Sequence, residues 1–293
     1  MRLIDRPVFV IGCNRSGTTL LFRTLGQHPD TWSYYDESQH VYYEYYPVDA
    51  ELGDRIVDSP GPEIATAIVR RLYAEAHNKE YFKDRRVLRF VPRKALQRQV
   101  NQLYKRAPVR LLEKTPANCF RIPFLAALFP DARFIFLIRR AEEVISSLME
   151  GWKHWSDSES RPWVFSRWHY LVPPGWQAWT GRRLEEICAF QWIESVGHAS
   201  RDLKALGADR FLLVKYGDIL KRPQELYAKV LDFCELPSSS FFDAQMRRER
   251  SVLHTQGGSA PAPKKWETLH LHEIESVRHM FADLQRKLYP DDD

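Results

Sequence analysis

The sequence predicts an α/β protein with a P-loop-like parallel sheet flanked by helices and a long aromatic-rich insertion. Two observations carry this prediction. Short apolar runs alternate with longer segments of helical periodicity, a pattern typical of parallel strands joined by helical crossovers. The first apolar run is followed directly by a glycine-rich turn, and the ligands of such sheets bind at the carboxyl ends of the strands.

Length and composition are those of a single domain that covers residues 1–293. The chain has 293 residues with 44% hydrophobic content, which is enough for a buried core. A net charge of only +5 does not indicate a nucleic-acid-binding protein. No apolar run reaches the length of about eighteen residues that a membrane span needs. We therefore expect a soluble protein with no transmembrane segment, although an anchor removed before the first residue would leave no trace.

The four cysteines, Cys13, Cys119, Cys188 and Cys234, lie far apart in the chain and contain no CxxC pair. This spacing is not that of a disulfide framework, so we expect a reducing, cytoplasmic location. Histidine, cysteine and aspartate do not cluster at the spacing of metal ligands, and we expect no metal.

The predicted strands are short and apolar, and most are followed by a predicted helix. We expect strands at residues 7–11, 109–112, 133–138 and 210–214. We expect helices at residues 18–26, 63–77, 94–106, 119–129, 141–151, 184–206, 223–234 and 271–288. Residues 31–60 are interpreted as a long loop with short helices, and residues 256–265 as a loop rich in glycine and proline. The sequence contains no internal repeat.

Residues 152–181 form the predicted insertion, which has little periodicity and contains Trp152, Trp155, Trp163, Trp168, Trp176 and Trp179. Irregular segments of this length inside a domain are usually binding loops or disordered, and the tryptophans argue against disorder. We expect core packing to use some of these rings. The others could form flat platforms for sugar rings, aromatic acceptors or lipid chains.

Residues 12–19 read Gly-Cys-Asn-Arg-Ser-Gly-Thr-Thr and have the glycine spacing of a phosphate-binding loop, G-x-x-x-x-G-K-[ST]. Backbone N–H groups in such a loop bind phosphate oxygens together with the positive end of the helix dipole. Thr18 stands where nucleoside triphosphatases carry a lysine, and Arg15 supplies a cation three residues earlier. Because that lysine contacts the β- and γ-phosphates, its absence argues against ATP or GTP hydrolysis. The alternative is that Gly12 and Gly17 only shape a turn.

Two motifs in this sequence resemble those of the sulfotransferase superfamily that uses 3'-phosphoadenosine 5'-phosphosulfate (PAPS). The first is Asn-Arg-Ser-Gly-Thr-Thr-Leu at residues 14–20, which resembles the 5'-phosphosulfate loop. The second is Phe-Ile-Phe-Leu-Ile-Arg at residues 134–139 followed by Ser147, which resembles the 3'-phosphate motif. The likeness is greatest to tyrosylprotein and bacterial glycan or lipid sulfotransferases. It implies transfer of a sulfonate group from PAPS to a hydroxyl, with adenosine 3',5'-bisphosphate (PAP) as the by-product.

The resemblance also implies which residues bind the donor and which take part in catalysis. The donor-binding residues that it implies are Asn14, Arg15, Ser16, Gly17, Thr18, Thr19, Arg139, Ser147, Tyr216 and Lys265. An arginine fork and a serine hydroxyl suit a phosphate monoester. Lys114 resembles a family lysine that reaches the sulfonate, and Arg15 is given the same kind of catalytic role. A solvated lysine or a structural tyrosine is the alternative interpretation at Lys114, Lys265 and Tyr216.

A base for the acceptor hydroxyl is expected in the acidic loop after the first helix, where Asp36, Glu37 and His40 are the candidates. Glu37 is preferred because relatives carry a catalytic glutamate after a His-Pro pair, here His28-Pro29. The spacing is one residue longer than in the tyrosylprotein enzymes, which leaves Asp36 as a competitor. A carboxyl group buried between aromatic residues would have its pKa raised toward the range useful for a base. The alternative is an acidic loop that is only solvated.

The acceptor is expected to be a saccharide or glycolipid hydroxyl, with a peptidyl tyrosine or small phenol as the second choice. No nucleic-acid partner is expected, and a homodimer is left open. Two other classes of function remain. A P-loop nucleotide kinase should carry the loop lysine and a metal-binding aspartate, whereas a non-catalytic nucleotide-binding scaffold would keep both phosphate motifs and lose the base.

Overall fold

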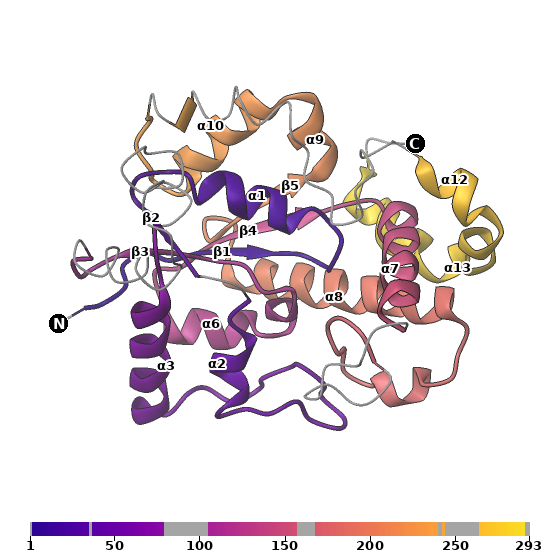
Figure 1. The fold of residues 1–293 in the computed structure, drawn as a ribbon, viewed down its shortest axis with the longest axis horizontal. Coiled ribbons are helices and arrows are strands. Elements are labelled where there is room, and N and C mark those ends of the chain that lie inside the picture. Colours follow the sequence, from indigo (N-terminus) through magenta and orange to yellow (C-terminus); the bar gives the residue numbers. More distant parts are fainter. Residues whose placement is uncertain are drawn as a thin grey trace, which may run out of the picture.

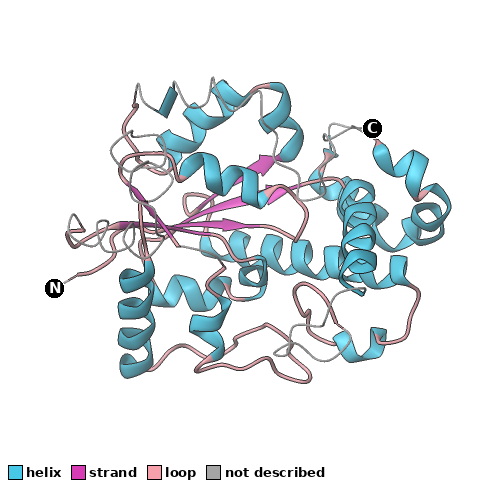
Figure 2. Cartoon of the chain, viewed as in Figure 1, coloured by secondary structure: helices cyan, strands magenta, loops and turns pink. Residues whose placement is uncertain are grey.

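The protein is built on one five-stranded sheet in which all neighbouring strands run parallel (Figures 1 and 2). The computed structural model describes residues 2–34, 37–78, 105–156, 168–239, 242–243 and 264–290. In chain order the strands are β1 (Val8–Ile11), β2 (Thr31–Ser33), β3 (Arg110–Glu113), β4 (Arg133–Ile138) and β5 (Phe211–Lys215). Their spatial order is β2-β3-β1-β4-β5. The carboxyl ends of these strands therefore share one edge of the sheet.

Helices cover both faces of the sheet, with α1, α9 and α10 above it in Figure 1 and α8, α6, α3 and α2 below it. The helices are α1 (Thr18–Leu25), α2 (Gln39–Tyr43), α3 (Pro62–Glu75), α6 (Ile122–Leu128), α7 (Ala141–Ser156), α8 (Leu184–Leu206), α9 (Tyr216–Lys221), α10 (Pro223–Phe233), α12 (Lys265–Leu269) and α13 (Leu271–Leu288), with 3-10 turns η2 (Pro116–Phe120) and η3 (Trp176–Trp179). In the described residues, no helix combines the length and the apolar character needed to cross a membrane.

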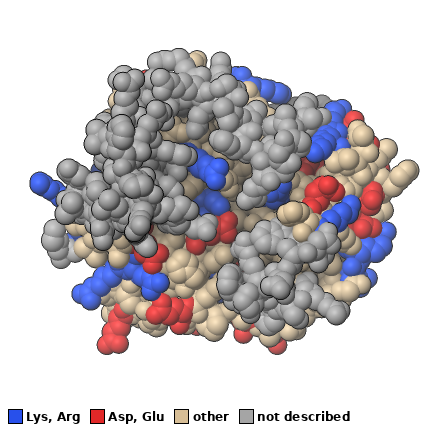
Figure 3. Space-filling view, in the orientation of Figure 1, with Lys and Arg blue, Asp and Glu red and all other residues tan. Residues whose placement is uncertain are grey.

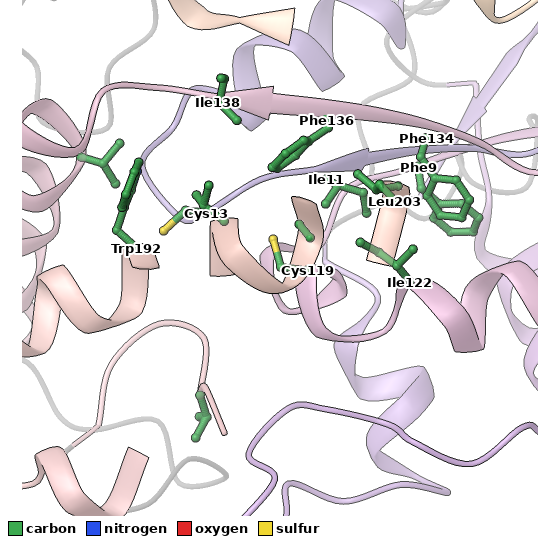
Figure 4. Close-up of a cluster of buried hydrophobic side chains, with 14 of the residues drawn as sticks. Phe9, Ile11, Cys13, Cys119, Ile122, Phe134, Phe136, Ile138, Trp192 and Leu203 are labelled. Carbon is green, nitrogen blue, oxygen red and sulfur yellow. The ribbon is translucent and has the colours of Figure 1, made fainter. Parts of the chain in front are cut away.

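Alternating residues of β1, β3 and β4 pack into two separate cores, because successive side chains of a strand point to opposite faces. Phe9 and Ile11 of β1 join Phe134 and Phe136 of β4 in the core that α8 covers, as Figure 4 shows. Val8 and Val10 belong to the other core, beneath α1 and α10. Burial on both faces explains why these strands read as continuous apolar runs in the sequence.

The four predicted strands are confirmed as β1, β3, β4 and β5, and the predicted helices at 184–206 and 271–288 match α8 and α13 residue for residue. Three predictions were wrong in detail. Residues 31–33 form the edge strand β2, where the sequence predicted only loop and short helices. The predicted helix at 119–129 is divided into η2 and α6, because Pro123 lies in the first turn of α6, where proline is tolerated, and not in a helix interior. Helix α7 runs five residues beyond 151 into the predicted insertion.

Two further predictions fall largely on residues that are not described. The predicted helix at 94–106 is one of them, and its last two residues, which the structure does describe, are not helical. The predicted loop at 256–265 is the other, and its last residue begins α12.

The described tryptophans of the insertion pack mostly into the protein. Trp152, Trp168 and Trp176 are each no more than 9% exposed. Their rings meet edge to face, with centroids 5.6 Å apart for Trp152 and Trp168 and 5.4 Å apart for Trp168 and Trp176. Trp179 stacks on Phe190 at 4.6 Å. The three buried rings are therefore part of the core and are not exposed platforms for a sugar.

A buried ion pair fastens the insertion to the loop that follows α2. Arg121 Nη2 lies 3.0 Å from Asp54 Oδ1, and both side chains are 1% exposed. The same carboxylate accepts hydrogen bonds from Tyr43 Oη at 2.5 Å and from the Val172 amide at 2.7 Å. Asp54 therefore joins three segments that are distant in the sequence.

Replacing Asp54 by alanine is expected to lower the free energy of unfolding by about 3–5 kcal/mol, because Arg121 would be left buried without its counter-charge. Urea denaturation measures this change. Asp283, whose ion pair with Arg286 is exposed, provides the control, and its replacement by alanine should change stability by no more than about 0.5 kcal/mol. Similar losses in the two variants would contradict the structural role given to Asp54.

Candidate active site

The turn between β1 and α1 has the geometry of an anion-binding loop. Arg15 and Gly17 adopt left-handed conformations, with φ of 67° and 96°. Helix α1 begins at Thr18 with no side-chain cap and no acidic residue in its first turn. The first N–H groups of an α-helix have no acceptor within the helix, so they can bind an anion placed there. Ser16 is 1% exposed, and its Oγ has no hydrogen-bond partner among the described residues.

Both glycines of this loop are required by close packing. A Cβ atom on Gly12 would lie 2.6 Å from the carbonyl oxygen of Leu137 in β4. A Cβ atom on Gly17 would lie 2.5 Å from the ring of Tyr216. The loop is therefore pressed against the carboxyl ends of β4 and β5. The interpretation that the two glycines only shape a turn does not account for these contacts.

The second predicted anion motif lies directly beside the first. Arg15 Nε donates a hydrogen bond to Ser147 Oγ at 3.0 Å, and Arg139 Nη1 donates to the carbonyl oxygen of Arg15 at 3.2 Å. Arg139 is also held by an ion pair at 2.9 Å with Glu143, which lies in the first turn of α7. The two motifs, about 125 residues apart in the sequence, thus form one continuous surface.

Tyr216 links this surface to β5. It is the first residue of α9, and the guanidinium of Arg139 lies over its ring at 4.5 Å from the centroid. Burial raises the pKa of its phenol. Its ring therefore contacts both Gly17 and Arg139. Lys265 is the exposed first residue of α12, which packs on α7, the helix that carries Ser147.

A further ion pair lies at the carboxyl end of β3. Lys114 Nζ donates to Glu37 Oε1 at 2.7 Å, and the two side chains are 9% and 25% exposed. The Glu37 carboxyl is therefore partly hydrated, which differs from the fully buried setting considered from the sequence. Asp36, the competing candidate for the base, lies outside the described residues. His40, the third candidate, instead contacts the hydroxyl of Tyr34 at 2.9 Å.

Sequence reasoning missed the polar residues that surround this ion pair. Glu113 is fully buried, and Ser38 Oγ donates a hydrogen bond to its carboxylate at 2.6 Å. Thr115 and Asn118 donate to the same carboxylate. The only signal for this group in the sequence was an acidic residue at the end of an apolar strand, which is not specific.

Asn14 connects the loop to the insertion. Its side-chain oxygen accepts a hydrogen bond from the Leu171 amide at 3.3 Å. The side chain of Asn14 therefore joins the loop to the returning end of the insertion through its oxygen atom.

Basic side chains lie together in a recess near the middle of the face drawn in Figure 3, with acidic side chains beside them. In the described part of the chain, no group of three or more histidine, cysteine, aspartate or glutamate side chains could hold a metal ion.

The comparison with protein-family models agrees with this geometry. The model of the sulfotransferase family matches residues 7–240, most of the chain. The chain belongs to the sulfotransferase family. The match begins just before β1 and includes both anion motifs, Tyr216 and the ion pair at β3. The predicted family and enzyme class are thus confirmed.

Solved structures of sulfotransferases share the fold. STF9 from Mycobacterium avium is 19% identical, with 96% of this chain and 76% of that chain covered and a TM-score of 0.54. STF1 from Mycobacterium tuberculosis H37Rv is 18% identical, with 96% of this chain and 77% of that chain covered and a TM-score of 0.50. The sulfotransferase domain from the curacin biosynthetic pathway is 17% identical, with 96% and 99% covered and a TM-score of 0.50. A comparison with curated proteins found no significant match.

Replacing Gly17 by alanine is expected to destabilise this sulfotransferase more than the same change at Gly175. Both glycines have positive φ, so each alanine should lose roughly 1–2 kcal/mol from the backbone conformation. Only at Gly17 would the new Cβ atom also overlap a side chain, that of Tyr216, whereas Gly175 has nothing within 4 Å. Denaturant unfolding gives the loss in free energy of unfolding for each variant, and the difference between the two losses is the cost of the overlap with Tyr216. Equal losses would show that the loop is not packed against Tyr216.

Proposed function

We propose that this sulfotransferase moves a sulfonate group from PAPS to a hydroxyl group of an acceptor. The observation that carries the proposal is the meeting of Arg15, Ser147 and Arg139 at the mouth of the anion-binding loop. PAPS carries phosphate groups at both its 5' and its 3' positions. Its binding site therefore needs two sets of hydrogen-bonding side chains close to each other. The absence of the loop lysine, with Thr18 in its position, supports this donor over a nucleoside triphosphate.

The residues of the loop fit the 5' end of PAPS. Ser16 offers a buried hydroxyl that lacks a partner among the described residues, and Thr18 and Thr19 offer the N–H groups of the first turn of α1. Arg139 and Ser147 would hold the 3'-phosphate, with Tyr216 beside the nucleotide and Lys265 covering it. When bound, PAPS would supply the sulfonate group and leave PAP behind.

The charged side chains have separate tasks in this proposal. Sulfonyl transfer resembles phosphoryl transfer, in which catalysis consists mainly of positioning and of stabilising negative charge. Arg15 and Lys114 supply cations to the moving group and to the leaving oxygen. Their contacts with Ser147 and Glu37 hold both cations in place before substrates bind.

Glu37 is the proposed base. Its Oε1 accepts a hydrogen bond from Lys114, and a carboxylate in this position can take the proton of the acceptor hydroxyl through its other oxygen. The Lys114–Glu37 contact supports this role, because it joins the proposed base to a proposed catalytic cation.

The acceptor is proposed to be a saccharide or glycolipid, with a peptidyl tyrosine or small phenol as the second candidate. The buried positions of Trp152, Trp168 and Trp176 remove part of the argument for sugar platforms.

Residues 1–293 are proposed to form one domain, because both cores are built on the same sheet. Four buried, free cysteines support a reducing compartment such as the cytoplasm.

PAP is expected to bind more tightly than ADP, because Arg139 and Ser147 would bind the 3'-phosphate that ADP lacks. Replacing Ser147 by alanine should weaken PAP binding by about tenfold, the effect of losing one hydrogen bond to a charged group, and should leave ADP binding unchanged. Isothermal titration calorimetry measures both affinities, with the exposed Ser276 of α13 replaced by alanine as the control. Equal affinity of the wild type for the two nucleotides would favour a P-loop kinase and overturn the donor assignment.

Replacing Glu37 by alanine should lower kcat for transfer from radiolabelled PAPS by about 10²- to 10⁴-fold, the usual contribution of a general base. Replacing Asp36 by alanine should have a much smaller effect. PAP affinity should be retained in both variants, which separates loss of the base from loss of the fold. The assay uses a panel of saccharide, glycolipid and phenolic acceptors. Undiminished transfer in both variants would refute the base assignment, and no transfer by the wild type to any acceptor would favour a non-catalytic scaffold.

A further inference from the structure

A fully buried carboxylate lies directly behind the Lys114–Glu37 ion pair. Glu113 is the last residue of β3 and has no exposed surface. A buried charge is costly unless hydrogen bonds satisfy it, so the surroundings of Glu113 must provide donors. The proposed chemistry gives Glu113 no task, because its carboxylate is enclosed by protein side chains.

Three side chains donate hydrogen bonds to this carboxylate. Ser38 Oγ donates to Oε1 at 2.6 Å, Thr115 Oγ1 donates to the same oxygen, and Asn118 Nδ2 donates to Oε2 at 2.6 Å. Thr115 Oγ1 in turn accepts a hydrogen bond from the backbone amide of Ser38 at 2.8 Å. Ser38 is thus held twice, through its backbone and through its side chain.

Three residues of this network are direct sequence neighbours of the Lys114–Glu37 ion pair. Ser38 directly follows Glu37, while Glu113 and Thr115 stand on either side of Lys114. The network therefore connects the neighbours of both members of the ion pair, across 75 to 77 residues of sequence. A loop residue fixed by two hydrogen bonds restricts where the adjacent Glu37 side chain can lie.

We propose that Glu113 is a positioning residue, which holds the Glu37 loop against the end of β3 through Ser38 and Thr115. This inference rests on the proposed function, in which Glu37 and Lys114 act on the acceptor and the moving group. Glu113 itself touches neither. Its effect is to fix the separation between the base and the cation before either substrate arrives.

The hydrogen-bond directions fit an ionised carboxylate. The two hydroxyl groups and the amide of Asn118 all donate to Glu113, and an ionised carboxyl group only accepts. Burial raises the pKa of Glu113, while the hydroxyl donors and nearby Lys114 favour the charged form. With Glu113 ionised, each hydroxyl and amide group of the network has a defined acceptor. The loop is therefore held in a single arrangement.

Thr115 offers an isosteric test of the network. Replacement by valine keeps the shape but removes both the donor to Glu113 and the acceptor for the Ser38 amide, whereas replacement by serine keeps the hydroxyl. We expect kcat to fall about a hundredfold in Thr115→Val, the effect of a displacement near 1 Å at a reacting group, and to be largely retained in Thr115→Ser. KM for PAPS and affinity for PAP should be unchanged in both. Thr66→Val, on the exposed surface of α3, is the control for the substitution itself.

Amide hydrogen exchange at Ser38 tests the same network without any catalytic assay. The Ser38 amide should exchange faster in Thr115→Val than in the wild type, in Thr115→Ser or in Thr66→Val. Should Thr115→Val fail to fold, Ser38→Ala serves instead. This change removes the side-chain hydrogen bond to Glu113 and leaves the hydrogen bond from the backbone amide of residue 38 to Thr115 Oγ1. The expected result for Ser38→Ala is a lower kcat at unchanged PAP affinity.

The outcomes separate this inference from the proposed function. Equal protection of the Ser38 amide in Thr115→Val and Thr115→Ser overturns the inference, whatever the chain catalyses. An unchanged kcat in both Thr115→Val and Ser38→Ala also overturns it, provided that the wild type transfers sulfonate. A wild type without transfer activity refutes the proposed function, and the exchange measurement still decides whether Thr115 holds Ser38 within the network.

Discussion

The parallel pairing of β1 with β4 is the constraint on which the rest of the site depends. Phe9 pairs with Phe134 and Ile11 with Phe136, so both strands end at the same edge of the sheet. The anion-binding loop follows β1 at this edge, and Arg139 follows β4. A different register would separate Arg139 from Arg15, because each residue of slip moves a strand by about 3.3 Å.

Close packing makes this arrangement rigid. Gly12 and Gly17 bring the loop backbone against Leu137 and Tyr216, at distances that no Cβ atom would allow. Cations that must meet a transferred group are effective only when they are held before the reaction, since reorganisation at that moment would raise the barrier. In the catalytic role proposed for Arg15, its contact with Ser147 would meet this requirement within the protein itself.

Buried acidic residues fix the irregular segments around the sheet. Asp54 joins Arg121, Tyr43 and the insertion at Val172, while Glu113 joins Ser38 and Thr115. Loops lack the regular hydrogen bonds of helices and strands, so each needs side-chain partners to adopt one conformation. In this protein the carboxylates of Asp54 and Glu113 supply such partners.

The sequence by itself determined the sheet strands that are buried on both faces, the long helices and the two anion motifs. Local signals suffice for these features, because apolar runs, helical periodicity and glycine spacing are properties of neighbouring residues. Only the tertiary structure decided that β2 pairs at the edge of the sheet, that Asn14 holds Leu171 and that Ser38 is tied to Glu113. These contacts join residues from about 75 to 157 positions apart, and no local pattern encodes which distant partner a short polar side chain will meet.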